Sequence, residues 1–92
     1  MPPEVIVDDD QRYLAWIAAH TWAYVVNCNR APSPDYVILH RSDCPTITGT
    51  PAAGDRWTDQ YSKVVSTDRS ALIEWCESRV GVRPLPCRMC AP

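Results

Sequence analysis

The sequence has no long hydrophobic segment and no large excess of charge of either sign. Its 92 residues include nine lysines and arginines and eleven aspartates and glutamates, which gives a formal net charge of −2. A membrane-spanning helix needs about 20 mostly apolar residues in a row, and no segment approaches that length. The first residues, MPPEVIVDDDQ, are acidic and differ from a basic leader followed by an apolar stretch. We therefore expect one small cytoplasmic domain, residues 1–92, that makes no contact with a membrane.

The motifs of the common catalytic sites are also missing. The chain has no glycine-rich phosphate-binding loop, no G-x-S-x-G motif and no HExxH motif. The acidic run of residues 8–10 is explained more simply as the start of a helix than as an oxygen-ligand metal site. We therefore expect that the protein is not an enzyme.

Cysteine is well represented, with five residues. An odd number argues against a closed framework of disulfides. In a reducing compartment, clustered cysteines bind metal more often than they form disulfides. A domain this small buries a modest core, so a bound metal would add useful stability.

The hydrophobic pattern predicts an α+β fold: a helix, a β-hairpin, a third strand, a second helix and a C-terminal metal-binding loop. The first helix is expected over residues 8–20, after a loose start at residues 1–8. Asp8 or Asp9 would cap it. Its apolar face is expected to hold Leu14, Ile17 and Ala18, with Tyr13 and Trp16 as flanks.

The later elements follow the same rules. Residues 22–28 and 35–41 are rich in β-branched and aromatic side chains and flank the turn sequence RAPSP, so we expect a hairpin. Residues 61–66 are expected to form the third strand. Residues 67–81 are expected to form the second helix, with Ser66 or Thr67 as cap and Gly81 as stop. The proline-rich tail is expected to be irregular.

Two short motifs supply a candidate metal site. His40 and Cys44 are separated by three residues after the second predicted strand, and Cys87 and Cys90 by two residues in the tail. Three sulfurs and one imidazole suit tetrahedral Zn²⁺, whereas Ca²⁺ and Mg²⁺ prefer oxygen. A redox role for the second motif is weaker, because such motifs usually open a helix and prolines precede this one.

The fourth ligand is less certain than the three cysteines. Cys28 or His20 could replace His40, although Cys28 is expected near the hairpin turn, at the opposite end from His40. Cys76 falls on the apolar face of the second predicted helix and is expected to be a small core residue.

The segments HRSDC, STDRSALIEWC and RPLPCRMC together resemble the amino-terminal zinc domain of Ada-type alkylation-repair proteins. The resemblance covers residues 36–90 and implies that His40, Cys44, Cys87 and Cys90 are zinc ligands. In the Ada-type pattern the first ligand is the cysteine that accepts a methyl group from a DNA phosphotriester. Here that position is His40, so methyl transfer is expected to be lost. The resemblance then implies a small structural or nucleic-acid-associated module.

Contact with DNA or RNA is the first function that we expect, through a local basic surface, because the net charge excludes a generally basic one. The segment GDRWTDQYSK mixes basic and aromatic side chains, as single-strand binding surfaces do, although a tryptophan in a long loop more often anchors the loop to the core. The expected contact residues are Arg41, Arg56, Trp57, Lys63, Arg83 and Arg88. The alternative is a zinc-stabilised structural or protein-interaction domain, which would expose an apolar patch around Trp16, Trp22 and Trp57.

Overall fold

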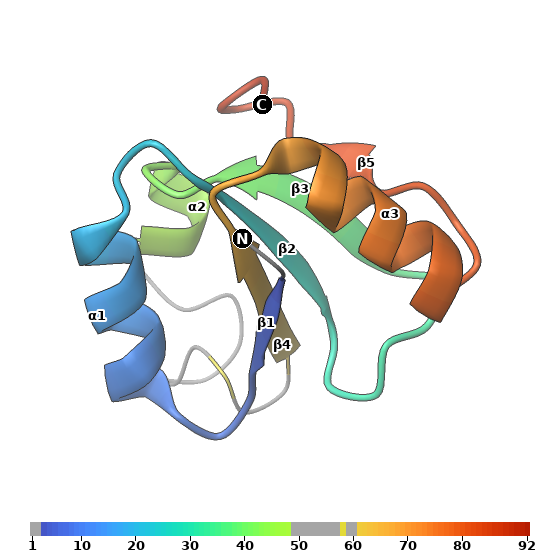
Figure 1. Ribbon diagram of the computed structural model, residues 1–92, viewed down its shortest axis with the longest axis horizontal. Coiled ribbons are helices and arrows are strands. Elements are labelled where there is room, and N and C mark those ends of the chain that lie inside the picture. Colours follow the sequence, from blue (N-terminus) through green and yellow to red (C-terminus); the bar gives the residue numbers. More distant parts are fainter. Residues whose placement is uncertain (1–2, 49–57, 59–60) are drawn as a thin grey trace.

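The computed structural model describes residues 3–48, 58 and 61–92, which form a mixed five-stranded sheet between helices (Figure 1). In chain order the elements are β1 (Glu4–Ile6), α1 (Asp10–Ala19), β2 (Tyr24–Asn29), β3 (Val37–Arg41), α2 (Pro45–Thr48), β4 (Tyr61–Ser66), α3 (Arg69–Arg79) and β5 (Leu85–Pro86). The predicted α+β class is confirmed. Within these residues, no helix is long and apolar enough to cross a membrane.

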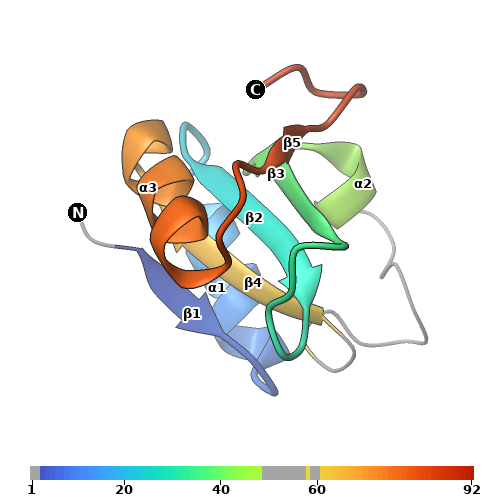
Figure 2. The same cartoon turned by 90° about the vertical axis from the view of Figure 1, so that its right-hand side faces the viewer.

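The sheet has the strand order β1-β4-β2-β3-β5, so strands distant in sequence lie side by side. β2 is central and pairs in antiparallel fashion with both β3 and β4. β1 is antiparallel to β4, whereas β5 runs parallel to β3 at the other edge, with Ile38 opposite Leu85. Figure 2 shows the strands side by side in this order, from β1 at the lower left to β5 at the upper right. The tail is thereby brought beside the strand that carries His40.

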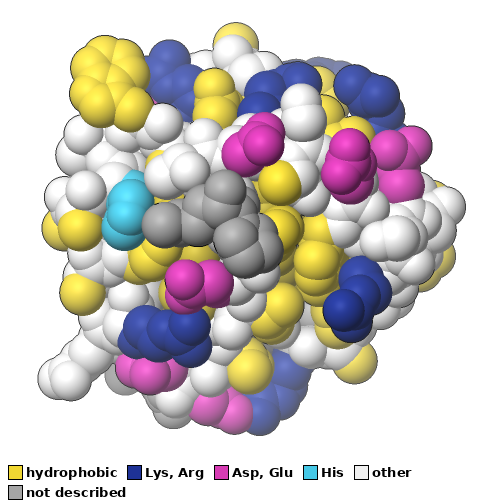
Figure 3. Space-filling view, viewed as in Figure 1, with side chains coloured by type: hydrophobic (Ala, Val, Ile, Leu, Met, Phe, Trp, Pro, Cys, Tyr) yellow, Lys and Arg dark blue, Asp and Glu magenta, His cyan; other side chains and the backbone are white. Residues whose placement is uncertain are grey.

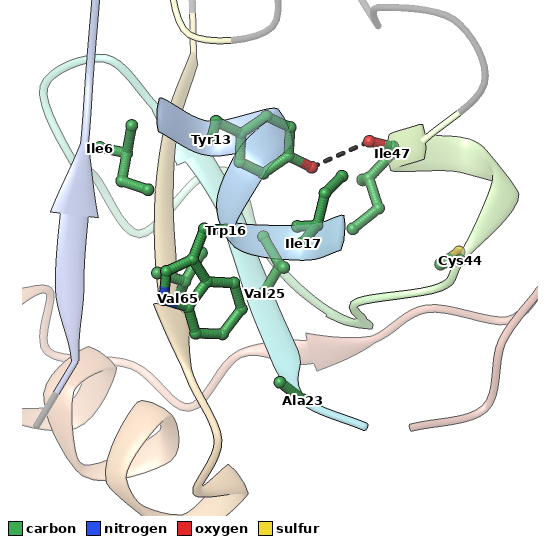
Figure 4. Close-up of a cluster of buried hydrophobic side chains, with 9 residues drawn as sticks. All are labelled: Ile6, Tyr13, Trp16, Ile17, Ala23, Val25, Cys44, Ile47 and Val65. Carbon is green, nitrogen blue, oxygen red and sulfur yellow. Dashed lines mark hydrogen bonds between the residues drawn. The ribbon is translucent and has the colours of Figure 1, made fainter. Parts of the chain in front are cut away.

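Two hydrophobic clusters hold the layers together. One joins α1 and α2 to the sheet, and Figure 4 shows its members, Ile6, Tyr13, Trp16, Ile17, Ala23, Val25, Cys44, Ile47 and Val65. The other joins α3 to the opposite face through Val26, Cys28, Val37, Leu39, Val64, Leu72 and Cys76. Because residues on a strand point alternately to the two faces, β2 contributes Val25 to the first cluster and Val26 to the second.

Helix α1 begins where it was predicted to begin but turns a different face inward. Asp9 is its cap and accepts a hydrogen bond from the backbone N–H of Arg12 at 3.1 Å. The buried residues are Tyr13, Trp16 and Ile17, whereas Leu14 is 39% exposed. Ala18 is also exposed. The expected apolar face was therefore wrong at Leu14 and Ala18 and right at Ile17, because the larger aromatic rings cover more of the sheet.

Helix α3 is capped by Asp68 and not by Ser66 or Thr67. The Asp68 side chain accepts hydrogen bonds from the backbone N–H groups of Ser70 and Ala71. Ser66 is the last residue of β4, and its hydroxyl accepts from the N–H of Asp68. Gly81 follows the helix with φ +90°, as expected for a glycine stop, and its N–H donates to the carbonyl of Cys76.

Both ends of the chain contain strand where none was expected. Residues 4–6 form β1, opposite Lys63, Val64 and Val65, and Ile6 is completely buried. Residues 85–86 form the short strand β5, although Pro86 has no N–H to donate. The carbonyl of Leu39 accepts instead from the N–H of Cys87 at 2.8 Å, which keeps the tail on the sheet.

Candidate metal centre

The end of β3 and the turn after it carry two of the four predicted ligands. His40 lies opposite Val25 in the sheet and is only 5% exposed. The chain then turns, with the N–H of Cys44 donating to the carbonyl of Arg41 at 3.0 Å. Cys44 immediately precedes α2 and is completely buried. This turn places both side chains at the same corner of the sheet.

Ser42 fastens that turn to the rest of the fold. Its hydroxyl donates to the carbonyl of His20 at 2.6 Å and accepts from the N–H of Ala23 at 3.1 Å. Its own N–H donates to the carbonyl of Ala23 at 2.8 Å. These bonds tie the turn between His40 and Cys44 to the connection between α1 and β2. The sequence analysis did not identify this role, because a serine in a turn carries no signal for its distant partner.

The tail brings the other two ligands to the same corner. Pairing of β5 with β3 leads into Cys87, and the N–H of Ala91 donates to the carbonyl of Cys87 at 3.1 Å, which curls the loop back. The backbone N–H of Arg41 donates to Sγ of Cys90 at 3.2 Å. Cys87 and Cys90 are partly buried and pack against the cluster that contains Cys44.

The four side chains offer their ligand atoms to one point. One nitrogen or sulfur atom from each of His40, Cys44, Cys87 and Cys90 lies within 4.8 Å of all the others. Sγ of Cys44 and Sγ of Cys87 are 3.8 Å apart, much longer than the ~2 Å of a disulfide. All five cysteines lie within the described residues, and none of them forms a disulfide. This donor set fits a soft or borderline metal ion.

The histidine is held in the protonation state that a metal requires. Burial and, as a smaller cause, the nearby positive charge of Lys63 together lower the pKa of His40 from 6.5 to about 4. The imidazole is therefore neutral at physiological pH, so it can offer a nitrogen lone pair to a cation.

The two tail cysteines differ in how easily they lose a proton. Burial raises the pKa of Cys87, but hydrogen bonds from the N–H groups of Cys90 and Met89 and from the Cys44 and Cys90 thiols outweigh it, so the pKa is lowered. Burial, with a smaller contribution from the nearby Cys44, raises the pKa of Cys90 to about 12, although the N–H of Arg41 acts in the opposite direction. A bound cation would favour both thiolates, because metal ions bind the deprotonated form.

The alternative ligands lie elsewhere. Cys28 is opposite Val37, at the other end of the hairpin from His40, and its thiol contacts the carbonyl of Ser62. The His20 ring stacks on Trp16 and its Nδ1 lies 2.9 Å from the Trp16 carbonyl. Cys76 is completely buried in the cluster beneath α3, as expected of a core residue.

The residues that were expected to contact nucleic acid differ in their exposure. Arg83 and Arg88 are exposed. Arg41 is also exposed, but its guanidinium donates two hydrogen bonds to the Asp43 carboxylate, at 2.9 and 2.7 Å. The expectation for Lys63 was wrong, because its side chain is only 1% exposed and lies between the sheet and α1. Arg56 and Trp57 lie outside the described residues.

Comparisons with protein-family models, curated proteins and solved structures find no match for this chain. The resemblance to the Ada-type domain therefore stays a prediction. The candidate metal centre rests on the geometry of its four side chains.

Proposed function

We propose that this chain is a non-enzymatic domain that binds one Zn²⁺ ion through His40, Cys44, Cys87 and Cys90. The observation that carries the proposal is the convergence of the four ligand atoms within 4.8 Å. Tetrahedral zinc with Zn–S bonds of about 2.3 Å requires sulfur–sulfur separations of about 3.8 Å. The separation between the Cys44 and Cys87 sulfurs is 3.8 Å. Small side-chain adjustments would bring the whole set to that geometry.

In this proposal the ion fastens the tail to the sheet. The tail buries little apolar surface against the sheet, since Leu85 is 66% exposed and Met89 is 70% exposed. Its strand β5 has only two residues. A zinc ion would link the end of β3 to a segment more than 40 residues later in the sequence. Because the complete site exists only in the folded chain, the free energy of zinc binding would add to the stability of the fold. We infer that the zinc is structural.

A catalytic role for the ion has less support. Zinc sites that activate water have three protein ligands and an open fourth position, whereas four protein ligands complete the tetrahedron. Each cysteine ligand also adds negative charge, so three thiolates leave the site at −1 and make the ion a poor Lewis acid. We therefore propose that the domain works by presenting a surface.

The proposal is tested by measuring the metal content of the purified protein and of three variants. We expect one zinc per chain in the parent, and loss of zinc or a weaker affinity in His40→Ala and Cys90→Ser. Cys76→Ser is the matched control, because it removes a buried thiol on the opposite face of the sheet. Absence of zinc from the parent, or equal zinc retention in all variants, would exclude the proposed site.

Nucleic-acid contact is a second candidate function, and one observation favours it. Arg83 and Arg88 are exposed near the proposed zinc loop, and in Figure 3 basic side chains gather along the upper edge of the molecule. Two phosphate contacts to a single strand would give a salt slope no steeper than about −1.4. Titration of a fluorescent single-stranded oligonucleotide at two salt concentrations measures that slope. Absence of binding at the lower salt concentration would exclude this candidate.

A further inference from the structure

Two adjoining hollows run along the sheet edge formed by β3 and β5. Ile38 and Leu85 line both of them. The one nearer the zinc loop has a volume of about 470 Å³ and extends to Pro86, Cys87 and Arg88. The other has a volume of about 420 Å³ and extends to Val82 and Arg83. Together they form a groove, here called the edge groove, with an apolar floor and an arginine toward each end.

The two arginines of the edge groove differ from others at the surface. Arg12, Arg30 and Arg41 form ion pairs with Glu4, Asp8 and Asp43. Within the described part of the chain, Arg83 and Arg88 form no ion pair and are exposed. The acidic residue that lines the groove is Asp35, whose carboxylate already accepts hydrogen bonds from Asn29 and Ser33. With two arginines and one carboxylate in its lining, the groove carries an excess of positive charge.

Proline at the rim limits how a partner could bind. The N–H of Cys87 points inward to the Leu39 carbonyl at 2.8 Å. Because successive N–H groups along a strand point to opposite sides, the outward donor of β5 would come from Pro86, which has no N–H. Addition of a further β-strand is therefore disfavoured. A partner would bind through its side chains.

We propose that the edge groove binds an acidic peptide segment of a protein partner. Aliphatic side chains of the segment would contact Ile38 and Leu85, and its carboxylates would accept hydrogen bonds from Arg83 and Arg88. This inference rests on the proposed function, because zinc would hold the loop that carries Arg88 in place. The floor favours a peptide over a nucleic acid, since the residues that both hollows share are aliphatic. The aromatic residue of the lining, Tyr36, already packs against Tyr61, with ring centres 5.3 Å apart, which leaves less of its ring for base stacking.

The test uses the zinc-loaded full chain and a fluorescently labelled ten-residue peptide in which leucines alternate with aspartates and glutamates. We expect measurable binding by fluorescence anisotropy. Arg83→Glu, Arg88→Glu and Leu85→Ser should each weaken it by about tenfold. Arg79→Glu is the matched control, because Arg79 is exposed at the end of α3 and does not line the groove. Arg79→Glu changes the net charge as much as Arg83→Glu and Arg88→Glu do, and it should alter the affinity for the peptide by less than about twofold.

Each outcome is informative once the zinc content of every protein has been measured. A parent without zinc counts against the proposed function, whereas a zinc-loaded parent that does not bind the peptide counts against this inference alone. An equal loss with Arg79→Glu would show a general charge effect and overturn the assignment to the groove. The protein could instead bind a single-stranded oligonucleotide and not the peptide, with the affinity reduced in Arg83→Glu and Arg88→Glu. That result would identify nucleic acid, and not a peptide, as the ligand of the edge groove.

Discussion

The ammonium group of Lys63 donates a hydrogen bond to Oδ1 of Asn27 at 2.6 Å in the interior of the domain. Lys63 is the single lysine of the chain, and its Nζ lies 5.5 Å from the ring centre of Tyr13 and 5.8 Å from that of Tyr61. Burial lowers its pKa from 10.5 to about 8, although Cys28 and Asp10 act in the opposite direction. The fold thus contains a buried amine that is costly to charge.

The first prediction is that this lysine makes stability rise with pH between about 8 and 10.5. In that window the unfolded chain binds a proton that the folded chain does not, so raising the pH favours folding. The full effect is at most about 3 kcal/mol, because one pKa unit corresponds to about 1.4 kcal/mol. Urea unfolding of the parent and of Lys63→Met at several pH values measures it as the difference between the two curves.

Using the difference also corrects for most of the effect of a thiol that titrates in the same range. Burial raises the pKa of Cys28 from 9.0 to about 11, which lowers stability as the pH rises from 9 to 11. Because Lys63 lowers the pKa of Cys28, this loss is somewhat larger in Lys63→Met. Asn27 loses its amine partner in Lys63→Met, which lowers the free energy of unfolding of this variant at all pH values. Parallel curves for the two proteins would show that Lys63 titrates normally and lies at the surface.

The sequence predicted the elements whose signals are local. Helical periodicity located α1 and α3, and β-branched runs around RAPSP located β2 and β3. The short spacings between His40 and Cys44 and between Cys87 and Cys90 predicted the four side chains that the fold brings together. These features depend on residues close to one another in the chain.

The missed features depend on distant partners. β1 has three residues and exists because Glu4 and Ile6 find β4, about 60 positions later. Lys63 was expected at the surface because lysines are rarely buried without a partner, and its partner Asn27 could be identified only from the strand register. Ser42 holds the candidate metal centre in place through His20 and Ala23, which lie 22 and 19 positions earlier in the chain.

A second prediction concerns Ser42 as a positioning residue. Ser42→Ala removes the hydroxyl's bonds to the His20 carbonyl and the Ala23 N–H and keeps the backbone bond to Ala23, so the turn between His40 and Cys44 should become less well ordered. We expect the zinc affinity to fall by about tenfold while one ion still binds. Competition with a chromophoric chelator measures the affinity, and Ser70→Ala, at an exposed position of α3, is the control. Equal affinities for the two variants would contradict a positioning role.

Metal removal should release the tail and leave α3 in place. The N–H groups of Arg41, Cys87 and Ala91 donate to atoms of the metal loop or of β3, so they should exchange faster with deuterium after chelation. The N–H of Val80 donates to the Cys76 carbonyl, and α3 packs on a cluster that contains no proposed ligand. Val80 should therefore keep its protection. Equal loss at Val80 would mean that zinc holds the whole domain together.

The last prediction is that the zinc-loaded protein does not accept methyl groups from DNA. In the Ada-type pattern that the sequence resembles, the acceptor cysteine occupies the position of His40. The His40 imidazole is neutral and only 5% exposed, and a zinc-bound nitrogen has no lone pair left with which to attack a phosphotriester. Incubation with methylphosphotriester DNA followed by mass spectrometry should show an unchanged protein mass. Methyl iodide is the positive control, because the partly exposed Cys87 and Cys90 are accessible to a small alkylating agent. A stoichiometric methyl group from DNA on Cys44, Cys87 or Cys90 would show that a thiolate other than the one expected from the pattern carries out the transfer.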